Sequence, residues 1–274
     1  MMTTIGLLHP GAMGAVLGSV LSDPVLWVST GRSPASRARA AAAGLQEVES
    51  LDSLTTAVDI VLSVCPPESA EDVAAAVADT GFDGVYVDAN AVSPATARRV
   101  GSRFARFVDG GIVGPPPTAP GLTRLYLAGD DAAMIANLFD GSPVEGRVVD
   151  GGSGAASAVK MCFASWTKGT SALLLAIRAL AEAEGVSESL LGEWATSMPD
   201  LVDRSETVSE AVGPKAWRFE GEMREIAATF AEDGLPGDFH LGAAEIYRRL
   251  APLKDQERPA LDAALELLLA DLPG

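Results

Sequence analysis

Cysteine and positive charge are both scarce in this sequence. Only two of its 274 residues are cysteines, Cys65 and Cys162. They lie far apart without a CxxC spacing, so we expect neither a metal site nor a disulfide framework. The 20 Lys and Arg are outnumbered by 37 Asp and Glu, which gives a formal net charge of -17. Such a surface repels nucleic acid and anionic membranes, so we expect neither as a partner.

Long hydrophobic runs are also missing. The longest apolar run begins with residues 172–177 and is interrupted by Arg178 and Glu182. It is therefore shorter than the roughly 20 residues that a membrane-spanning helix needs. The first residues, MMTTIGLLHPG, have no basic segment and no cleavage-like site, which argues against a signal peptide. We therefore expect a cytoplasmic protein.

The composition is that of a globular protein, and the residue pattern changes at about residue 150. Hydrophobic residues make up 48% of the chain and charged residues 21%, which is typical of a folded protein. Before residue 150, apolar segments alternate with helical ones, and this predicts a mostly parallel sheet covered on both faces. The expected strands are residues 4–8, 25–29, 59–64, 84–88, 106–113, 125–128 and 147–149. The expected helices are residues 15–21, 34–43 and 69–78, and one that Ser93 caps and Pro94 begins.

Beyond residue 150 we expect helices alone. One long helix covers residues 155–184, and Gly185 suits its C-terminal cap. Further helices are expected at residues 187–196, 199–212, 217–232, 242–250 and 258–269. The predicted fold class is therefore α/β, with a Rossmann-type doubly wound domain at residues 1–150 and an all-α domain at residues 151–274.

A glycine-containing turn joins the first strand to the first helix. It reads HPGAMG over residues 9–14, whereas a dinucleotide-binding turn reads G-x-G-x-x-G. Gly11 and Gly14 occupy the second and third glycine positions, which allow a pyrophosphate to approach and the helix to pack closely on the strand. His9 replaces the first glycine. The free N–H groups of the helix would face the phosphates; the alternative is a plain strand-to-helix turn.

The loop after the second strand favours NADP over NAD. NAD-selective sites carry an acidic residue there for the ribose 2′-OH, but residues 29–33 read STGRS. Arg32, flanked by the hydroxyls of Thr30 and Ser33, suits a 2′-phosphate, since a guanidinium binds phosphate through paired hydrogen bonds. We therefore expect NADPH as the cofactor; the alternative is a solvated basic loop.

Several segments, in their order along the chain, resemble the 6-phosphogluconate dehydrogenase-like superfamily, which includes β-hydroxyacid dehydrogenases and imine reductases. GLLHPGAMG at residues 6–14 resembles its G-x-I-G-x-G-x-M-G opening, and Cys65-Pro66-Pro67 resembles its loop beside the cofactor. VDANAVSP at residues 87–94 resembles its nicotinamide-side segment, and DGGIVG at residues 109–114 stands where its D-A-P-V-S-G substrate segment would be. Gly152, Gly154 and Lys160 resemble its G-x-G-x-x-x-K-x-x-N-N helix, and residues 219–240 resemble a bacterial subgroup with a poorly characterised C-terminal domain.

The resemblance implies a Rossmann domain, an all-α substrate and dimerisation domain, and a homodimer whose C-terminal helices interlock. It places a small-molecule substrate in a cleft between the domains. The candidate catalytic residues are Lys160, Asn90 and Thr167. The candidate cofactor contacts are His9, Pro10, Gly11, Ala12, Met13, Gly14, Thr30, Arg32, Ser33, Cys65, Pro66 and Asn90. The candidate substrate contacts are Val113, Gly114, Lys168, Glu222 and His240.

Lys160 is the candidate proton donor and acceptor. A lysine in a dry cleft can have its pKa lowered enough for general acid–base catalysis, or it can polarise a carbonyl as a cation. Thr167 lies about two turns further along the same helix face. Glu222 falls about where the family has a second lysine, and this reversed charge would disfavour an acidic substrate.

Departures from the family pattern leave the substrate open. Phe163 and Ala164 replace the two asparagines after the lysine, Val113 replaces a substrate-binding serine, and Ala91 replaces a threonine. Several groups that would hold a carboxylate are therefore missing. The sequence predicts an NADP(H)-dependent oxidoreductase acting on a small carbonyl or hydroxy compound. The alternatives are imine reduction and a non-catalytic NADPH-binding protein.

Overall fold

The computed structural model describes residues 3–254 and 256–270, and the chain divides into two compact units, Met1–Phe163 and Ala164–Gly274. The first unit is built on an eight-stranded sheet of order β3-β2-β1-β4-β5-β6-β7-β8. The strands are β1 (Ile5–Leu8), β2 (Val25–Val28), β3 (Gln46–Val48), β4 (Ile60–Ser63), β5 (Val85–Asp88), β6 (Phe107–Val113), β7 (Thr123–Ala128) and β8 (Val144–Val148). All neighbouring strands are parallel except the pair β6 and β7.

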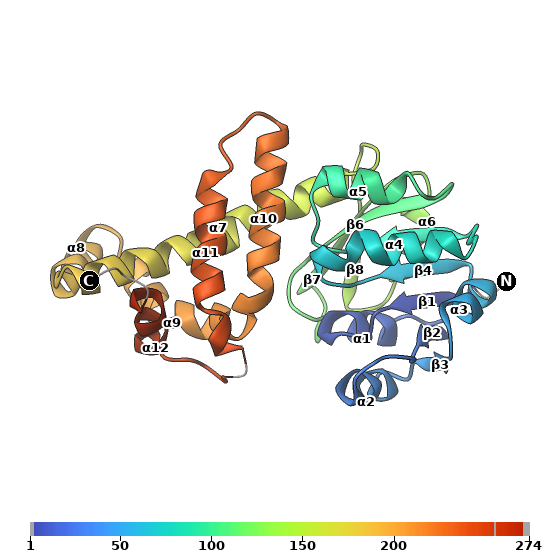
Figure 1. The fold of residues 1–274 in the computed structure, drawn as a ribbon, viewed down its shortest axis with the longest axis horizontal. Helices are drawn as coiled ribbons and strands as arrows, with labels where there is room; N and C mark the ends of the chain where they lie inside the picture. The colour runs from blue at the N-terminus through green and yellow to red at the C-terminus, as the bar shows by residue number, and fades with distance from the viewer. Residues whose placement is uncertain (1–2, 255, 271–274) are drawn as a thin grey trace. The chain divides into compact units, whose positions relative to one another are not determined.

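Helices cover both faces of this sheet (Figure 1). They are α1 (Ala12–Ser19), α2 (Pro34–Ala42), α3 (Leu51–Ala57), α4 (Ala70–Asp79), α5 (Pro94–Gly101) and α6 (Ala132–Asn137), with a short 3₁₀ turn η1 (Pro67–Ser69) before α4. Leu7 of β1 packs in a core with residues of α1, α2 and α6. Its neighbour Leu8 packs in a second core with residues of α3, α4 and α5. Successive side chains of a strand point to opposite faces, so a fully apolar strand such as β1 serves both cores.

The α/β fold class and the seven expected strands are confirmed. The prediction missed β3, which has three residues and a polar Gln-Glu-Val sequence at the edge of the sheet. An edge strand of this length buries too little to need an apolar pattern. Ser93 caps α5 as predicted, since its hydroxyl accepts a hydrogen bond from the backbone N–H of Thr96.

The second unit consists of helices in its described part. Long helix α7 (Ala155–Ala183) enters it from the first unit, and α8 (Ser187–Ser197), α9 (Asp200–Val212), α10 (Ala216–Glu232), α11 (Asp238–Arg249) and α12 (Leu261–Leu269) follow, with 3₁₀ turns η2 (Gly213–Lys215) and η3 (Ala251–Leu253). Gly185, just beyond α7, has a φ of +69°, the left-handed conformation that suits a glycine at a helix C-terminus. Tyr247 of α11 and Phe219 of α10 pack edge to face in the core, with ring centroids 5.3 Å apart.

The two compact units separate within α7, between Phe163 and Ala164, whereas the change in sequence pattern lies at residue 150. The difference has a local cause. The first turns of α7 are tied to the sheet, because Asp109 of β6 accepts hydrogen bonds from Gly154 and Ser157. The beginning of the helix therefore belongs with the strands.

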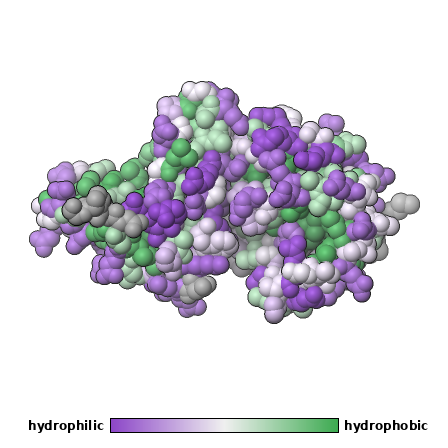
Figure 2. Space-filling view, viewed as in Figure 1, coloured by the Kyte–Doolittle hydropathy of each residue, from purple (hydrophilic) through white to green (hydrophobic). Residues whose placement is uncertain are grey.

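The face of the molecule drawn in Figure 2 is mostly polar. Figure 2 shows hydrophilic residues over much of the face that it draws, with smaller patches of hydrophobic residues between them. Among the helices that the structure describes, none has the length and apolar character to cross a membrane.

Candidate functional site

The turn between β1 and α1 has the two properties that its glycines predict. A Cβ atom at Gly14 would lie 2.2 Å from the carbonyl oxygen of His9, so only glycine allows α1 to start this close to the strand. A Cβ at Gly11 would meet nothing within 4 Å. Gly11 is the N-cap of α1, and no side chain caps this helix end. The first N–H groups of α1, which begins at Ala12, therefore have no side chain as acceptor at this cap.

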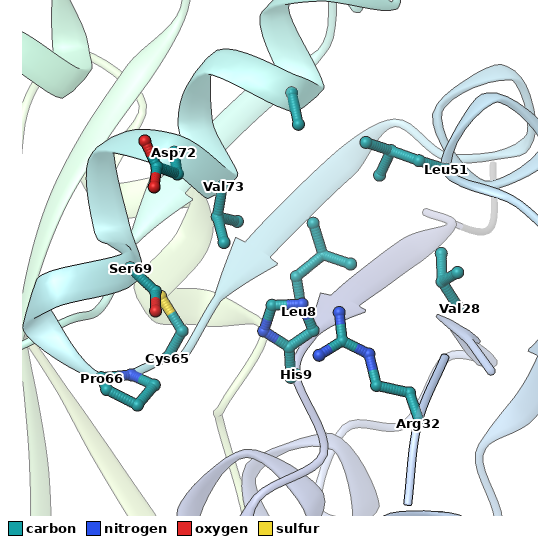
Figure 3. A pocket seen from close by; sticks show the side chains of 11 residues that line it. Leu8, His9, Val28, Arg32, Leu51, Cys65, Pro66, Ser69, Asp72 and Val73 are labelled. Carbon is teal, nitrogen blue, oxygen red and sulfur yellow. The ribbon is translucent and has the colours of Figure 1, made fainter. Parts of the chain in front are cut away.

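A cavity of about 410 Å³ lies at the carboxyl ends of β1, β2 and β4 (Figure 3). It is lined by Leu8, His9, Val28, Arg32, Leu51, Cys65, Pro66, Ser69, Asp72, Val73 and Ala76. Strand β1 lies between β2 and β4. The chain adds β2 and β3 on one side of β1 and then adds β4 on the other side. In open α/β sheets, ligands bind at such a switch point, outside the carboxyl ends of the strands.

Arg32 brings a positive charge into this cavity. It follows Gly31, whose φ of +74° turns the loop after β2, and its side chain points toward His9 in Figure 3. The Nε of Arg32 is buried and has no hydrogen-bond partner among the described residues. Arg37, in contrast, donates to the carbonyl oxygen of Ser29 at 2.8 Å. Arg32 therefore has the charge and an unused donor that an anionic ligand requires.

His9 lies beside Arg32 in an uncharged state at neutral pH. Burial, reinforced by the charge of Arg32, lowers the pKa of the His9 imidazole to about 4. The imidazole therefore adds hydrogen-bonding capacity to the cavity without competing with Arg32 for an anion.

The two hydroxyls beside Arg32 have structural contacts. Thr30 donates from Oγ1 to the carbonyl oxygen of Glu49 at 2.5 Å. Ser33 caps α2, since its Oγ accepts the backbone N–H of Ser36 at 3.2 Å. Both hydroxyls hold the loop that carries Arg32, and each oxygen keeps capacity for a further hydrogen bond.

Asn90 holds the loop that follows β4. Its Oδ1 accepts the backbone N–H of Cys65 at 2.6 Å, and its Nδ2 donates to Ser63 Oγ at 3.1 Å. Burial raises the pKa of the Cys65 thiol to about 12, so this thiol stays protonated. Asn90 thus fixes Cys65 and Pro66 at the rim of the cavity. The contact of Asn90 with substrate or nicotinamide stays a prediction.

Lys160 lies against β6. A Cβ at Gly111 would be 3.0 Å from the Lys160 Cβ and 2.6 Å from the carbonyl oxygen of Ala156. Val113, two residues further on the same face of the strand, is buried. Gly114 has a φ of +115°, and its Cβ would be 2.1 Å from the Leu122 carbonyl oxygen. Within the predicted substrate segment, Gly111 therefore packs closely against the lysine, and Val113 and Gly114 offer no polar side chain.

Two of the substrate candidates in the second unit contact each other. Lys168 and Glu222 form an ion pair in which both side chains are largely buried, and the Lys168 ammonium lies 4.4 Å from the centroid of the Phe219 ring. The negative charge of Glu222 is therefore balanced within the protein, which removes the sequence-based reason for disfavouring an acidic substrate. Thr167, also on α7, is half-buried.

His240 is buried in the same unit, between aromatic rings. Its ring centroid lies 4.5 Å from that of Phe230 and 5.2 Å from that of Phe239. Its Nδ1 is buried without a hydrogen-bond partner in the described part of the chain, and burial lowers its pKa.

Leu51, Asp72 and Asp109 are not among the site residues that the sequence predicts. Leu51 and Asp72 line the cavity but belong to no motif. Asp109 is predicted only as part of the segment at residues 109–114, and its hydrogen bonds to α7 span 45 and 48 residues. A buried carboxylate after a run of apolar strand residues was the available signal, because such a group needs donors nearby.

Comparisons with known proteins agree with this fold. Residues 181–250 match the model of a family described as a domain of unknown function, DUF1932. An uncharacterized 28.5 kDa protein of Methanothermus fervidus, from the 7S RNA 5′ region, is 31% identical over 193 residues, covering 68% of this chain and 74% of that protein.

Solved structures of three proteins are similar over nearly the whole chain. One is a conserved protein of unknown function described as similar to 3-hydroxyacid dehydrogenases: 27% identity, TM-score 0.66, covering 92% of this chain and 99% of that one. Mycobacterium tuberculosis 3-hydroxyisobutyrate dehydrogenase with L-serine has 20% identity and TM-score 0.71, covering 98% and 99%. Aspergillus terreus reductive aminase with NADPH and ethyl levulinate has 19% identity and TM-score 0.54, covering 98% and 100%.

Proposed function

Because this chain belongs to the 6-phosphogluconate dehydrogenase-like superfamily of β-hydroxyacid dehydrogenases and imine reductases, we propose that it is an NADP(H)-dependent oxidoreductase. Its substrate is a small carbonyl or hydroxy compound. The observation that carries the proposal is the buried, unpartnered Nε of Arg32 in a cavity at the switch point of the sheet. A buried donor of this kind calls for an acceptor.

The residues fit the phosphates of NADPH. Arg32 would bind the ribose 2′-phosphate, with Thr30 and Ser33 beside it. The N-terminus of α1 would receive the pyrophosphate, since Gly11 leaves the approach open and the first N–H groups of a helix attract anions. The structure of the reductive aminase contains NADPH, which supports the same choice of cofactor here.

Lys160 would hold the proton at the reacting atom of the substrate. When bound, the nicotinamide supplies or accepts the hydride. The ammonium of Lys160 would donate a hydrogen bond to the carbonyl oxygen and then give up the proton as the alcohol forms. In the reverse direction the amine would take the proton from the hydroxyl group. Strand β6, whose Gly111 packs against Lys160, would keep water from this side of the lysine.

Imine reduction is the second candidate. Ala164 and Val113 are both buried. Because both side chains are apolar, neither offers a polar group to a carboxylate. A substrate without a carboxylate, such as a small imine, would need no such anchor. Binding of NADPH without turnover is the third hypothesis. The activity assay below distinguishes it from the two enzymatic ones.

A homodimer through the C-terminal helices is also proposed. Trp166, Leu173 and Leu180 follow one another at intervals of seven along α7, and they are 69%, 44% and 62% exposed. Residues seven apart lie on nearly one helix face, and large exposed apolar patches mark contact surfaces. Light scattering should therefore give twice the chain mass, and a Trp166→Glu, Leu173→Glu variant should give the mass of one chain.

The test of the function is NADPH-dependent turnover on panels of small carbonyl compounds and imines. We expect the absorbance of NADPH to fall with at least one carbonyl substrate, and Lys160→Ala to lower kcat at least tenfold with little change in NADPH affinity. Unchanged turnover in Lys160→Ala would remove the lysine from the mechanism. NADPH binding without turnover across both panels would contradict the enzyme proposal.

A further inference from the structure

The carboxylate of Asp109 joins the middle of the sheet to the start of α7. Its Oδ2 accepts the backbone N–H of Gly154 at 3.0 Å and that of Ser157 at 2.9 Å. Its Oδ1 accepts the hydroxyl of Ser157 at 2.6 Å. The Asp109 side chain is fully buried, so these bonds form away from water, where charge-assisted hydrogen bonds are strong.

The backbone N–H groups that donate to Asp109 lie at the start of a helix, where no carbonyl group of the helix itself can accept them. Helix α7 begins at Ala155, and the first N–H groups of a helix have no intrahelical acceptor. They also form its positive end, which favours a negative charge nearby. A carboxylate from a distant strand thus takes the place of an N-cap side chain and sets where the helix starts.

Gly111 fixes how closely the helix approaches the strand. It lies two residues after Asp109 and therefore on the same face of β6. A methyl group at this position would come within 2.6 Å of the Ala156 carbonyl oxygen and 3.0 Å of the Lys160 Cβ. Lys160 is three residues beyond Ser157, about one turn along the same helix face. Asp109 and Gly111 therefore set both the start of the helix and its distance from the sheet.

We propose that Asp109 is a positioning residue, which acts through Ser157 and the N-terminus of α7 to fix the place of Lys160. This inference rests on the proposed function only in its effect on turnover. Asp109 itself would touch neither substrate nor cofactor, because its two oxygens are occupied by α7. Burial raises the pKa of its carboxyl group, an effect that the hydrogen bonds from Ser157 and Gly154 oppose.

The experiment compares Asp109→Ala, Asp109→Asn and Ser157→Ala with Asp150→Ala, which removes an exposed carboxylate just before the helix. The first readout is the rate at which acetic anhydride acetylates Lys160, followed by peptide mass spectrometry across pH 6–10. We expect Asp109→Ala to shift the midpoint of that pH profile by at least half a unit. Asp109→Asn keeps an acceptor for the two N–H groups and should stay near wild type, as should the Asp150→Ala control.

The second readout is turnover, with NADPH affinity measured alongside it. We expect kcat to fall at least tenfold in Asp109→Ala and several-fold in Ser157→Ala, while the dissociation constant for NADPH changes less than threefold. Unchanged acetylation and kcat in Asp109→Ala would overturn the proposal. If Asp109→Ala does not fold, unchanged values in both Ser157→Ala and Gly111→Ala would overturn it. A shifted acetylation profile in a protein without NADPH-dependent turnover would support the positioning role and contradict the proposed function.

Discussion

Arg32 and His9 line one cavity from the ends of neighbouring strands, and the charge of the first helps to keep the second neutral. Burial is the larger cause, and the Arg32 guanidinium adds to it, so that the pKa of His9 is lowered to about 4. The cavity therefore holds a cation and a neutral imidazole side by side (Figure 3). This arrangement offers an anion one fixed positive charge, and a second positive charge that appears only in acid.

The lowered pKa of His9 predicts a loss of stability in acid. In the unfolded chain His9 takes up a proton near its ordinary pKa of 6.5, but in the folded protein only near 4. The unfolded state thus binds more protons between these values, so stability falls as the pH drops from about 6.5 to 4. A shift of this size corresponds to up to about 3 kcal/mol. Urea unfolding at pH 7, 5.5 and 4.5 should show a smaller loss in His9→Gln than in the wild type.

The comparison isolates His9 because both proteins carry the same carboxylates and differ only at this residue. An equal loss of stability in wild type and His9→Gln across this range would contradict the interpretation.

Gly11 and Gly14 should respond to alanine in opposite ways. At Gly14 the added Cβ would lie 2.2 Å from a backbone oxygen, so Gly14→Ala should cost at least about 2 kcal/mol in the free energy of unfolding. At Gly11 the Cβ meets open space, so Gly11→Ala should cost about 1 kcal/mol or less as an N-cap change. Gly11→Ala should nevertheless weaken NADPH binding at least tenfold, because the methyl group stands where the pyrophosphate would approach. Thermal unfolding of both variants measures their stability, and titration calorimetry measures their affinity for NADPH. If Gly11→Ala binds NADPH as tightly as the wild type, the phosphates do not bind at this turn.

The buried pair of Lys168 and Glu222 predicts strong coupling in a double-mutant cycle. Their side chains are 15% and 11% exposed, and loss of one partner leaves a buried charge, which costs about 3–5 kcal/mol. Lys168→Met and Glu222→Gln should each destabilise by an amount of this order, and the double variant by much less than their sum. Glu220→Gln on the same helix is the control, because its ion pair with the half-exposed Arg224 should contribute less than about 1 kcal/mol. Additive effects of the two single changes would show that the pair is not coupled.

Local patterns in the sequence predict the helices, the strands and the turn between β1 and α1. They do not predict contacts between residues that are far apart in the chain. The apolar run of β1 and the capping serine of α5 can be read from neighbouring residues, and both predictions are confirmed. The bonds from Asp109 to α7 and the pairing of Lys168 with Glu222 join residues 45 to 54 positions apart. Such contacts depend on how strands and helices pack, and no local pattern encodes them.

The most direct test of the account is the affinity of the protein for NADPH and NADH, measured by titration calorimetry in the wild type, Arg32→Gln and the control Arg103→Gln. The control changes an exposed arginine just after the C-terminal end of α5. A charged hydrogen-bonding contact contributes roughly 1.5–3 kcal/mol, which is about 10- to 150-fold in the dissociation constant. We predict that the wild type and Arg103→Gln bind NADPH at least tenfold more tightly than NADH, and that Arg32→Gln loses this preference while its NADH affinity stays nearly the same. Equal or tighter binding of NADH by the wild type, or no binding of either nucleotide, would contradict the proposal that Arg32 binds the 2′-phosphate of NADPH.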